Sequence, residues 1–480
     1  MLLRNLRVGG SLVDIRADGG VITSVAPGLP GDGVDFNGRF ASPGLWDNHV
    51  HFTQWALHSQ RLDVSAATSA RGAAELVGGQ LSGLSGGKAA YQNPARAGVF
   101  VATGFRDALW PDLPTVAMLD DATGETPVVL ISGDLHCVWA NSAALDRYGQ
   151  STETLLREEP AFEVTTAVGQ LDDATLDAWA LEAGVRAAAR GVVGFADLEM
   201  AWNRDTWLRR MAAGFDSQRV EFAIYTQHLD RAIAEGLRTD APINELLTVG
   251  RYKVLTDGSL NTRTAWCVEP FAGTANRGGL EIDPATLTMH MRRAVAAGIE
   301  PSVHAIGDAA ISVALDAFEA VGAGGRIEHA QLVAASDLER FAALGVTASV
   351  QPEHAMDDRD VADVYWAGQT GRVIPLRSLL AAGARLVFGS DAPVAPLDPW
   401  VTMAAAVGRS RDGREPWHAE QCVTNAEALA ASTRSSIAVG QPADLVITDI
   451  DPLTATHEQL RAMPVYATVL QGRFTYLEQQ

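Results

Sequence analysis

Two histidines, His49 and His51, stand two residues apart in an Asp-Asn-His-Val-His run. On a β-strand, side chains two residues apart point to the same face, so both imidazoles can reach one metal ion. A His-x-His pair alone is weak evidence for a metal. This pair, however, ends a predicted strand that follows an Ala-Ser-Pro-Gly turn, where a barrel would carry its catalytic face. The pair therefore predicts one part of a metal site.

Four further side chains suited to metal binding stand at or near the ends of separate predicted strands. They are Lys253, His304, His329 and Asp391. Counted from the His-x-His strand, they fall on the fourth, fifth, sixth and eighth strands. A single histidine on an apolar strand is more often a packed core residue. Packing does not readily explain this whole set at the carboxyl ends of strands, so the set predicts a metal centre.

The strands that carry these residues belong to a repeating pattern of short β-branched runs and Ala-rich amphipathic segments. This rhythm is typical of parallel strands joined by crossover helices. With the His-x-His strand, eight strands are expected, the other seven at 192–198, 220–226, 251–256, 300–304, 326–329, 346–351 and 385–389. Eight strands fit an α/β (β/α)8 TIM barrel. The rival, a doubly wound open sheet, lacks a Gly-rich phosphate fingerprint after its first strand.

The two chain ends and one internal stretch depart from this rhythm. Hairpin-like strands fill the first 45 residues, and three strand-like runs close the chain. We therefore expect a small β-sandwich domain from residues 1–45 and 435–480, and a metal-binding barrel over 46–434. Residues 56–185 are predicted to be an insertion between barrel strands 1 and 2. Loops on the carboxyl face of a barrel build its active site, so the insertion is expected to shape the substrate pocket.

The order of these motifs resembles the amidohydrolase superfamily, and most closely its branch that includes N-substituted formamide deformylases. The insertion run 132–141 (Ser-Gly-Asp-Leu-His-Cys-Val-Trp-Ala-Asn) is similar to that branch. So are the fourth-strand run 253–260 (Lys-Val-Leu-Thr-Asp-Gly-Ser-Leu) and the C-terminal run 440–446 (Gly-Gln-Pro-Ala-Asp-Leu-Val). The resemblance covers nearly the whole chain and implies the barrel fold and metal-dependent hydrolysis.

The resemblance also implies a role for each candidate ligand. His49, His51 and Asp391 would hold one divalent metal, most simply Zn²⁺, and His304 and His329 a second. Lys253 would bridge the two metals as an N-carboxylated lysine formed with CO2. The alternative is one metal and an unmodified Lys253. Histidine and carboxylate ligands also suit iron, nickel and manganese.

The modification has an independent physical rationale. Two unit charges about 4 Å apart interact by about 4 kcal/mol at an effective dielectric of about 20. A lysine cation beside divalent metals would be repelled by several times that energy. Lys253 must therefore lose its proton, point away, or react with carbon dioxide to become an anion.

The expected reaction is hydrolysis of a carbon–nitrogen bond other than a peptide bond, in an amide, formamide or cyclic amide. Metal binding lowers the pKa of water to about 7 and polarises a carbonyl. Asp391 would act as general base and then as general acid. The alternatives are an ester, lactone or carbamate hydrolase on the same centre, and a barrel that has lost its chemistry. The resemblance implies that His136 approaches the substrate. Arg263 is a candidate contact whose alternative is an ion pair that anchors its loop, and His354 is one whose alternative is a place in the core or behind the site. Trp139 could line an apolar pocket or simply be packed.

Composition restricts the partners. The 480 residues carry a formal net charge of −21, whereas nucleic-acid binding needs clustered Lys and Arg. No uncharged apolar stretch approaches about 18 residues, so no membrane span is expected. Three widely separated cysteines and the lack of a signal-peptide pattern predict a reducing, cytoplasmic setting. The expected partner is a small-molecule substrate, and the resemblance suggests a homodimer.

Overall fold

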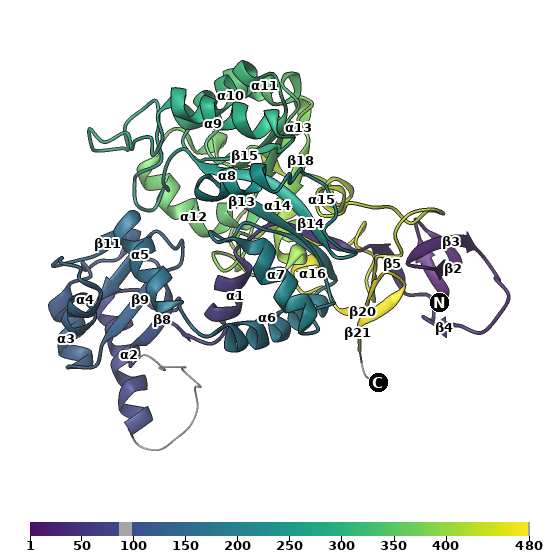
Figure 1. Ribbon diagram of the computed structural model, residues 1–480, viewed down its shortest axis with the longest axis horizontal. Coiled ribbons are helices and arrows are strands. Elements are labelled where there is room, and N and C mark those ends of the chain that lie inside the picture. The colour runs from purple at the N-terminus through teal and green to yellow at the C-terminus, as the bar shows by residue number, and fades with distance from the viewer. Residues whose placement is uncertain (86–97, 479–480) are drawn as a thin grey trace.

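A computed structural model describes residues 1–85 and 98–478 of the protein; residues 86–97 of the predicted insertion lie outside this part. Three sheets organise the described residues: a parallel barrel, a sheet built from both chain ends, and a sheet within the insertion. Figure 1 shows the barrel between the other two sheets, with both chain termini on the side of the terminal sheet. The predicted fold class, a (β/α)8 barrel with a small β-domain from both ends, is confirmed.

Eight parallel strands form the barrel in chain order. They are β6 (Leu45–Val50), β12 (Val192–Asp197), β13 (Arg219–Tyr225), β14 (Leu247–Leu255), β15 (Pro301–Ala305), β16 (Gly325–His329), β17 (Val346–Val350) and β18 (Leu386–Phe388). Most of their residues are buried, as expected for strands covered by helices on one face and packed inside the barrel on the other. Apolar β-branched runs of this length, bounded by turn residues, therefore become strands rather than helices.

Helices cover the outside of the barrel. They are α6 (Asp173–Ala188), α7 (Asn203–Ala212), α8 (Leu229–Ala234), α9 (Pro284–Ala296), α10 (Asp308–Val321), α11 (Leu338–Ala343), α12 (Pro352–Tyr365), α13 (Leu376–Ala381), α14 (Pro399–Gly408), α15 (Asn425–Ala431) and α16 (His457–Arg461). Their starts follow local chemistry: Asp283 caps α9 by accepting from the amides of Ala285 and Thr286, and Thr424 forms a capping box with Glu427. Short 3₁₀ turns lie at Asp107–Leu109, Thr226–His228, Ala335–Asp337, Thr370–Arg372 and Ala419–Gln421.

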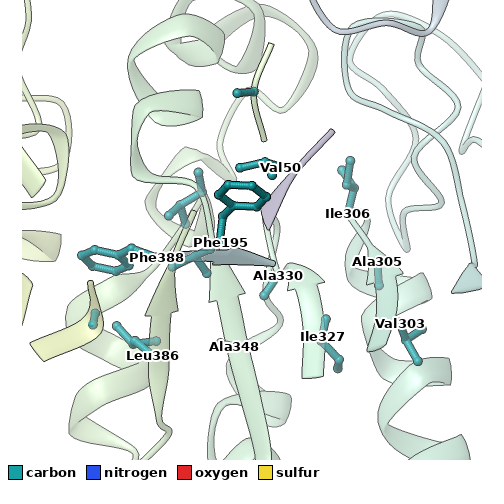
Figure 2. Close-up of a cluster of buried hydrophobic side chains, with 14 of the residues drawn as sticks. Val50, Phe195, Val303, Ala305, Ile306, Ile327, Ala330, Ala348, Leu386 and Phe388 are labelled. Carbon is teal, nitrogen blue, oxygen red and sulfur yellow. The ribbon is translucent and has the colours of Figure 1, made fainter. Parts of the chain in front are cut away.

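The barrel core is apolar and closely packed. Figure 2 shows Phe195 beside Val50, with Ile327, Ala348 and Phe388 on neighbouring strands. The ring of Phe195 stacks on Phe52 with 4.5 Å between centroids and an angle of 9° between planes. Because these rings come from β12 and from the helix after β6, they attach the first helix to the barrel.

The first and last barrel strands meet without a regular ladder, so the barrel is nearly closed. The amide of Asp391 donates to the carbonyl of His49 at 2.7 Å, and the amide of His51 donates to the carbonyl of Ala392 at 2.8 Å. Asn48 donates from its side chain to the carbonyl of Phe388 at 2.9 Å. The candidate ligands His49, His51 and Asp391 therefore stand on the seam itself.

Both chain ends contribute to the terminal sheet, in the order β21-β20-β19-β5-β1-β2-β3, with β4 paired to β1. Its strands are β1 (Leu2–Val8), β2 (Ser11–Asp18), β3 (Val21–Ala26), β4 (Val34–Asp35), β5 (Phe40–Pro43), β19 (Leu445–Thr448), β20 (Val465–Leu470) and β21 (Arg473–Leu477). β5 leads directly into barrel strand β6. An ion pair between Arg219 and Asp444, 2.7 Å long, joins this sheet to the barrel.

The segment between β6 and β12 has a sheet of its own, in the order β11-β10-β9-β8-β7. Its strands are β7 (Leu62–Asp63), β8 (Phe100–Phe105), β9 (Val128–Ser132), β10 (Cys137–Ala140) and β11 (Leu156–Arg157). Its helices are α2 (Ala70–Ser85), α3 (Val116–Thr123), α4 (Ser142–Tyr148) and α5 (Glu159–Val168), and α1 (Phe52–His58) joins it to the barrel. Figure 1 places this sheet and its helices beside the barrel, on the side away from the terminal sheet. Among the described residues, no helix is long and apolar enough to cross a membrane.

The aromatic cluster predicts a stability effect. Phe195→Ala removes a side chain with no exposed surface and leaves a cavity against Phe52, so it should lower the free energy of unfolding of the barrel by roughly 3–5 kcal/mol. Chemical denaturation followed by circular dichroism measures the change. Leu113→Ala, at a side chain that is 77% exposed, is the control and should shift stability by less than about 0.5 kcal/mol. Equal effects of the two substitutions would contradict this account of the core.

Candidate metal centre

One cavity of about 430 Å³ opens among the carboxyl ends of the barrel strands and the insertion. All six predicted ligands line it: His49, His51, Lys253, His304, His329 and Asp391. Their strand positions explain the convergence, because the carboxyl ends of parallel strands gather on one face of a barrel. Residues up to 342 positions apart in the sequence therefore share one site.

Three of these residues form the tightest group. Ligand atoms of His49, His329 and Asp391 all lie within 4.8 Å of one another, and the three residues are buried. Nε2 of His51 lies 3.3 Å from Oδ1 of Asp391, the same distance as Nε2 of His49. His304 joins from the next strand, with its ring centroid 4.5 Å from that of His329.

Buried polar side chains orient two of the imidazoles. Nδ1 of His49 lies 2.8 Å from Oε2 of Glu328, whose other oxygen accepts from Ser302 at 2.6 Å. Nδ1 of His329 lies 2.9 Å from Oε1 of Gln351. Metal-bound histidines commonly donate their second ring nitrogen to such acceptors, which directs the other nitrogen at the metal. The sequence analysis did not identify Glu328 and Gln351 as partners of these histidines. The one sequence signal for each was a polar residue at the end of an apolar strand, which does not say what the side chain contacts.

Burial favours imidazoles that can bind a metal. Burial holds the pKa of His304 and of His329 well below the ordinary value, and it also lowers the pKa of His49. Burial also acts to lower the pKa of His51, but the hydrogen bond and the charge of Asp391 outweigh this effect and raise the pKa. Three of the four histidines are therefore neutral at pH 7, and neutral imidazole is the form that binds metals.

Lys253 is buried beside these imidazoles and is 2% exposed. Within the described part of the chain, its amine has no hydrogen bond or ion pair. Burial lowers the pKa of Lys253, while the charges of Glu328 and Asp391 oppose this shift. The whole chain has two lysines, Lys88 and Lys253. Because lysine is so rare in this sequence, its presence among the candidate ligands is not explained by a high lysine content.

The residues present fit a divalent metal. The group combines neutral imidazoles with the Asp391 carboxylate, and the histidines lower the pKa of Asp391 well below its ordinary value despite burial. Buried nitrogens of His51 (Nδ1) and His354 (Nε2) have no hydrogen-bond partner among residues 1–85 and 98–478. Two of the residues also adopt left-handed backbone conformations, with φ of 72° at His329 and 58° at Asp391. Such conformations are costly and cluster at functional sites.

His136 and His354 line the same cavity from opposite parts of the chain. His136, on the insertion, pairs with Glu158 at 2.8 Å, and Glu158 accepts from the hydroxyl of Thr264 at 2.8 Å. This chain of contacts links the insertion to the loop after β14. Nε2 of His354 lies 4.0 Å from Oδ2 of Asp391. Both histidines therefore belong to the wall of the cavity.

The other two candidate contacts lie elsewhere. Trp139 is fully buried in the core of the insertion and donates from its indole to the carbonyl of Thr115 at 2.9 Å. The guanidinium of Arg263 lies 5.1 Å from the ring centre of Tyr365. Neither is among the described residues that line the cavity. The tryptophan packs in the core of the insertion, and the arginine lies over the ring of Tyr365.

The His136–Glu158 pair predicts a pH-dependent link. Glu158 and Asp134 raise the pKa of His136 to about 9 against burial, and His136 lowers the pKa of Glu158 to about 2. A raised histidine pKa stabilises the fold below pH 6.5 and loses this effect as pH rises through about 9. A lowered carboxylate pKa stabilises above pH 4.5 and loses this effect as pH falls through about 2. The link is therefore strongest between pH 4.5 and 6.5.

Comparison of wild type with Glu158→Gln tests this window. Thermal unfolding should show a deficit of about 1–3 kcal/mol for the variant at pH 6. The deficit should shrink as pH rises past 9. Glu163→Gln, on helix α5, which begins directly after Glu158, is the control and should show no such trend. A deficit that stays constant from pH 6 to pH 10 would contradict the assignment.

Comparison with known proteins places the chain. Residues 32–476 match the model of the amidohydrolase family. The chain is 29% identical to Protein LONG AFTER FAR-RED 3 of Arabidopsis thaliana over 94% of this chain and 85% of that protein. It is 25% identical to N-substituted formamide deformylase of Arthrobacter pascens over 98% of this chain and 94% of that protein.

The fold agrees with this match. An uncharacterized metal-dependent hydrolase from Pyrococcus horikoshii has a TM-score of 0.78 to this structure at 22% identity, covering 95% of this chain and 99% of that one. The family match spans most of the chain, including every barrel strand and all six candidate ligands. The chain belongs to the amidohydrolase family.

Proposed function

We propose that the protein is a metal-dependent hydrolase that cleaves a carbon–nitrogen bond other than a peptide bond, in an amide, formamide or cyclic amide. The observation that carries this proposal is the buried group of His49, His329 and Asp391 at the base of a cavity, with His51, His304 and Lys253 around it. The similarity to N-substituted formamide deformylase supports the choice of bond.

In this proposal His49, His51 and Asp391 would hold one divalent metal, and His304 and His329 would hold a second. Lys253, as an N-carboxylated lysine, would supply a ligand to both. The lowered pKa of Lys253 favours this, because a neutral amine is the form that attacks CO2. Attack forms the N–C bond and releases one proton, which leaves an anionic carbamate with two ligand oxygens. Zn²⁺ fits the nitrogen and oxygen donors, as do other transition metals.

The chain's own residues then carry out the proton transfers. When bound, the metals supply Lewis-acid polarisation of the carbonyl and a lowered pKa for water. Asp391 accepts a proton from the attacking water and delivers it to the leaving nitrogen. Glu328 keeps Nε2 of His49 aimed at the site by holding Nδ1. His354, 4.0 Å from Asp391, and His136, a cation at neutral pH, are placed to donate hydrogen bonds to the carbonyl substituents.

Metal content provides the first test. Wild-type protein purified without chelators should contain close to two divalent metals per chain by plasma mass spectrometry. Lys253→Ala should lower this number by removing the bridge, while Lys88→Ala, at the other lysine, should leave it unchanged. About one metal per chain in both wild type and Lys253→Ala would contradict the bridged centre.

Activity on matched substrates provides the second test. Wild-type protein should hydrolyse simple N-alkyl formamides, and Asp391→Asn should lower kcat by about 10²–10⁴-fold because the proton acceptor is lost. Asp412→Asn, at an exposed carboxylate, is the control. The same alkyl groups should also be offered as formate esters and as N-alkyl carbamates. Turnover of the esters or carbamates without the formamides would assign a different bond to the same centre.

A further inference from the structure

The cavity wall contains one arginine with an unusual environment. Arg61, which follows helix α1, is 9% exposed and lines the same cavity as the six candidate ligands. Among the described residues, its side chain has no ion pair or hydrogen bond. Burial lowers the pKa of Arg61 to about 10, and no nearby carboxylate acts in the opposite sense. Arg61 is therefore a buried cation at neutral pH with no counter-ion in the described part of the chain.

The other arginines of the cavity wall are compensated. Arg106 lies 3.2 Å from Asp357. Arg209 and Arg210 both pair with Asp177, at 2.7 Å and 3.2 Å. Asp173, the cavity-lining carboxylate on helix α6, pairs with Arg209 at 3.1 Å. Arg61 is thus the exception among the cavity-lining arginines of the described chain.

Among the residues that the structure describes, no carboxylate pairs with Arg61. Residues 86–97 contain no Asp or Glu, and neither do the last two residues. Burying a guanidinium is costly unless a partner accepts its hydrogen bonds. A partner from outside the chain, present when the cavity is occupied, would compensate Arg61.

The position of Arg61 sets where that partner lies relative to the metal centre. Helix α1 begins directly after His51 and ends at His58, three residues before Arg61. Seven helical residues span about 10 Å. Leu57 and Leu176 line the cavity as well and supply apolar surface to its wall. The cavity therefore has metal-ligand candidates at one end and a lone cation on the order of 10 Å away.

We propose that Arg61 is the anion subsite of the substrate pocket, and that the substrate is an amide or formamide whose far end carries a carboxylate. This inference rests on the proposed function and adds the substrate class. A guanidinium matches a carboxylate with two parallel hydrogen bonds. One uncompensated positive charge corresponds to one negative charge, which favours a carboxylate over a phosphate dianion.

The test compares two substrates of equal length, N-formyl-6-aminohexanoate and N-formylhexylamine. Wild-type protein should prefer the charged substrate in kcat/KM by about 10–100-fold, the effect of a hydrogen-bonded charge. Arg61→Gln should abolish that preference, and Arg61→Lys should restore part of it because the charge remains but the planar fork is lost. Arg186→Gln is the control. This exposed arginine lies near Arg61, because it donates a hydrogen bond to the hydroxyl of Ser59 at 2.8 Å, and the variant should keep the wild-type preference.

A second measurement separates this inference from the proposed function. Hexanoate and hexyl phosphate should each be titrated into wild type and Arg61→Gln by calorimetry. Hexanoate binding that is lost in Arg61→Gln supports the subsite even when neither formamide is hydrolysed. Hydrolysis of both formamides at equal kcat/KM by wild type supports the proposed function and overturns the subsite. Absence of hexanoate binding, equal binding by both proteins, or tighter binding of the phosphate overturns the carboxylate assignment.

Discussion

The candidate centre depends on one structural constraint, the closure of the barrel between its first and last strands. The backbone bonds that join His49 to Asp391 and His51 to Ala392 are the same bonds that bring these side chains together. Asp47 strengthens the seam by accepting from the amides of Ser390, at 2.9 Å, and His49, at 3.1 Å. Gly389 permits it, since a Cβ atom there would lie 2.7 Å from Cβ of His49. The same backbone hydrogen bonds therefore close the barrel and bring the candidate ligands together.

Below the seam, buried charges compensate one another. Glu221 accepts from Arg251 and Arg434, at 2.5 Å and 2.6 Å, and their charges lower the pKa of Glu221 despite burial. Glu328 stands above this group and contacts His49. Breaking a buried charge pair is strongly destabilising, because one charge is left uncompensated. Ser302, which donates to the other oxygen of Glu328 at 2.6 Å, fixes the orientation of this carboxylate, and through it the direction in which His49 presents its second nitrogen.

The insertion supplies the other wall of the cavity and is attached by polar contacts. The contacts from His136 through Glu158 to Thr264 connect it to the loop after the fourth barrel strand, which carries Lys253. The candidate ligands thus stand at the ends of barrel strands, while the other wall of the cavity stands on a separate unit. On barrels in general, such a wall can vary without disturbing residues at the strand ends.

The sequence by itself determined the barrel and the set of candidate ligands. Local patterns were sufficient, because parallel strands gather their carboxyl ends, so Lys253, His304, His329 and Asp391 converge whatever the intervening loops do. The tertiary structure alone decided the contacts between distant elements. Glu328 reaches His49 across 279 positions, Trp139 enters a core instead of the cavity, and Arg61 lies buried with no counter-ion among the described residues. No periodicity encodes these outcomes, because each depends on which side chains of other elements fill the space around the residue.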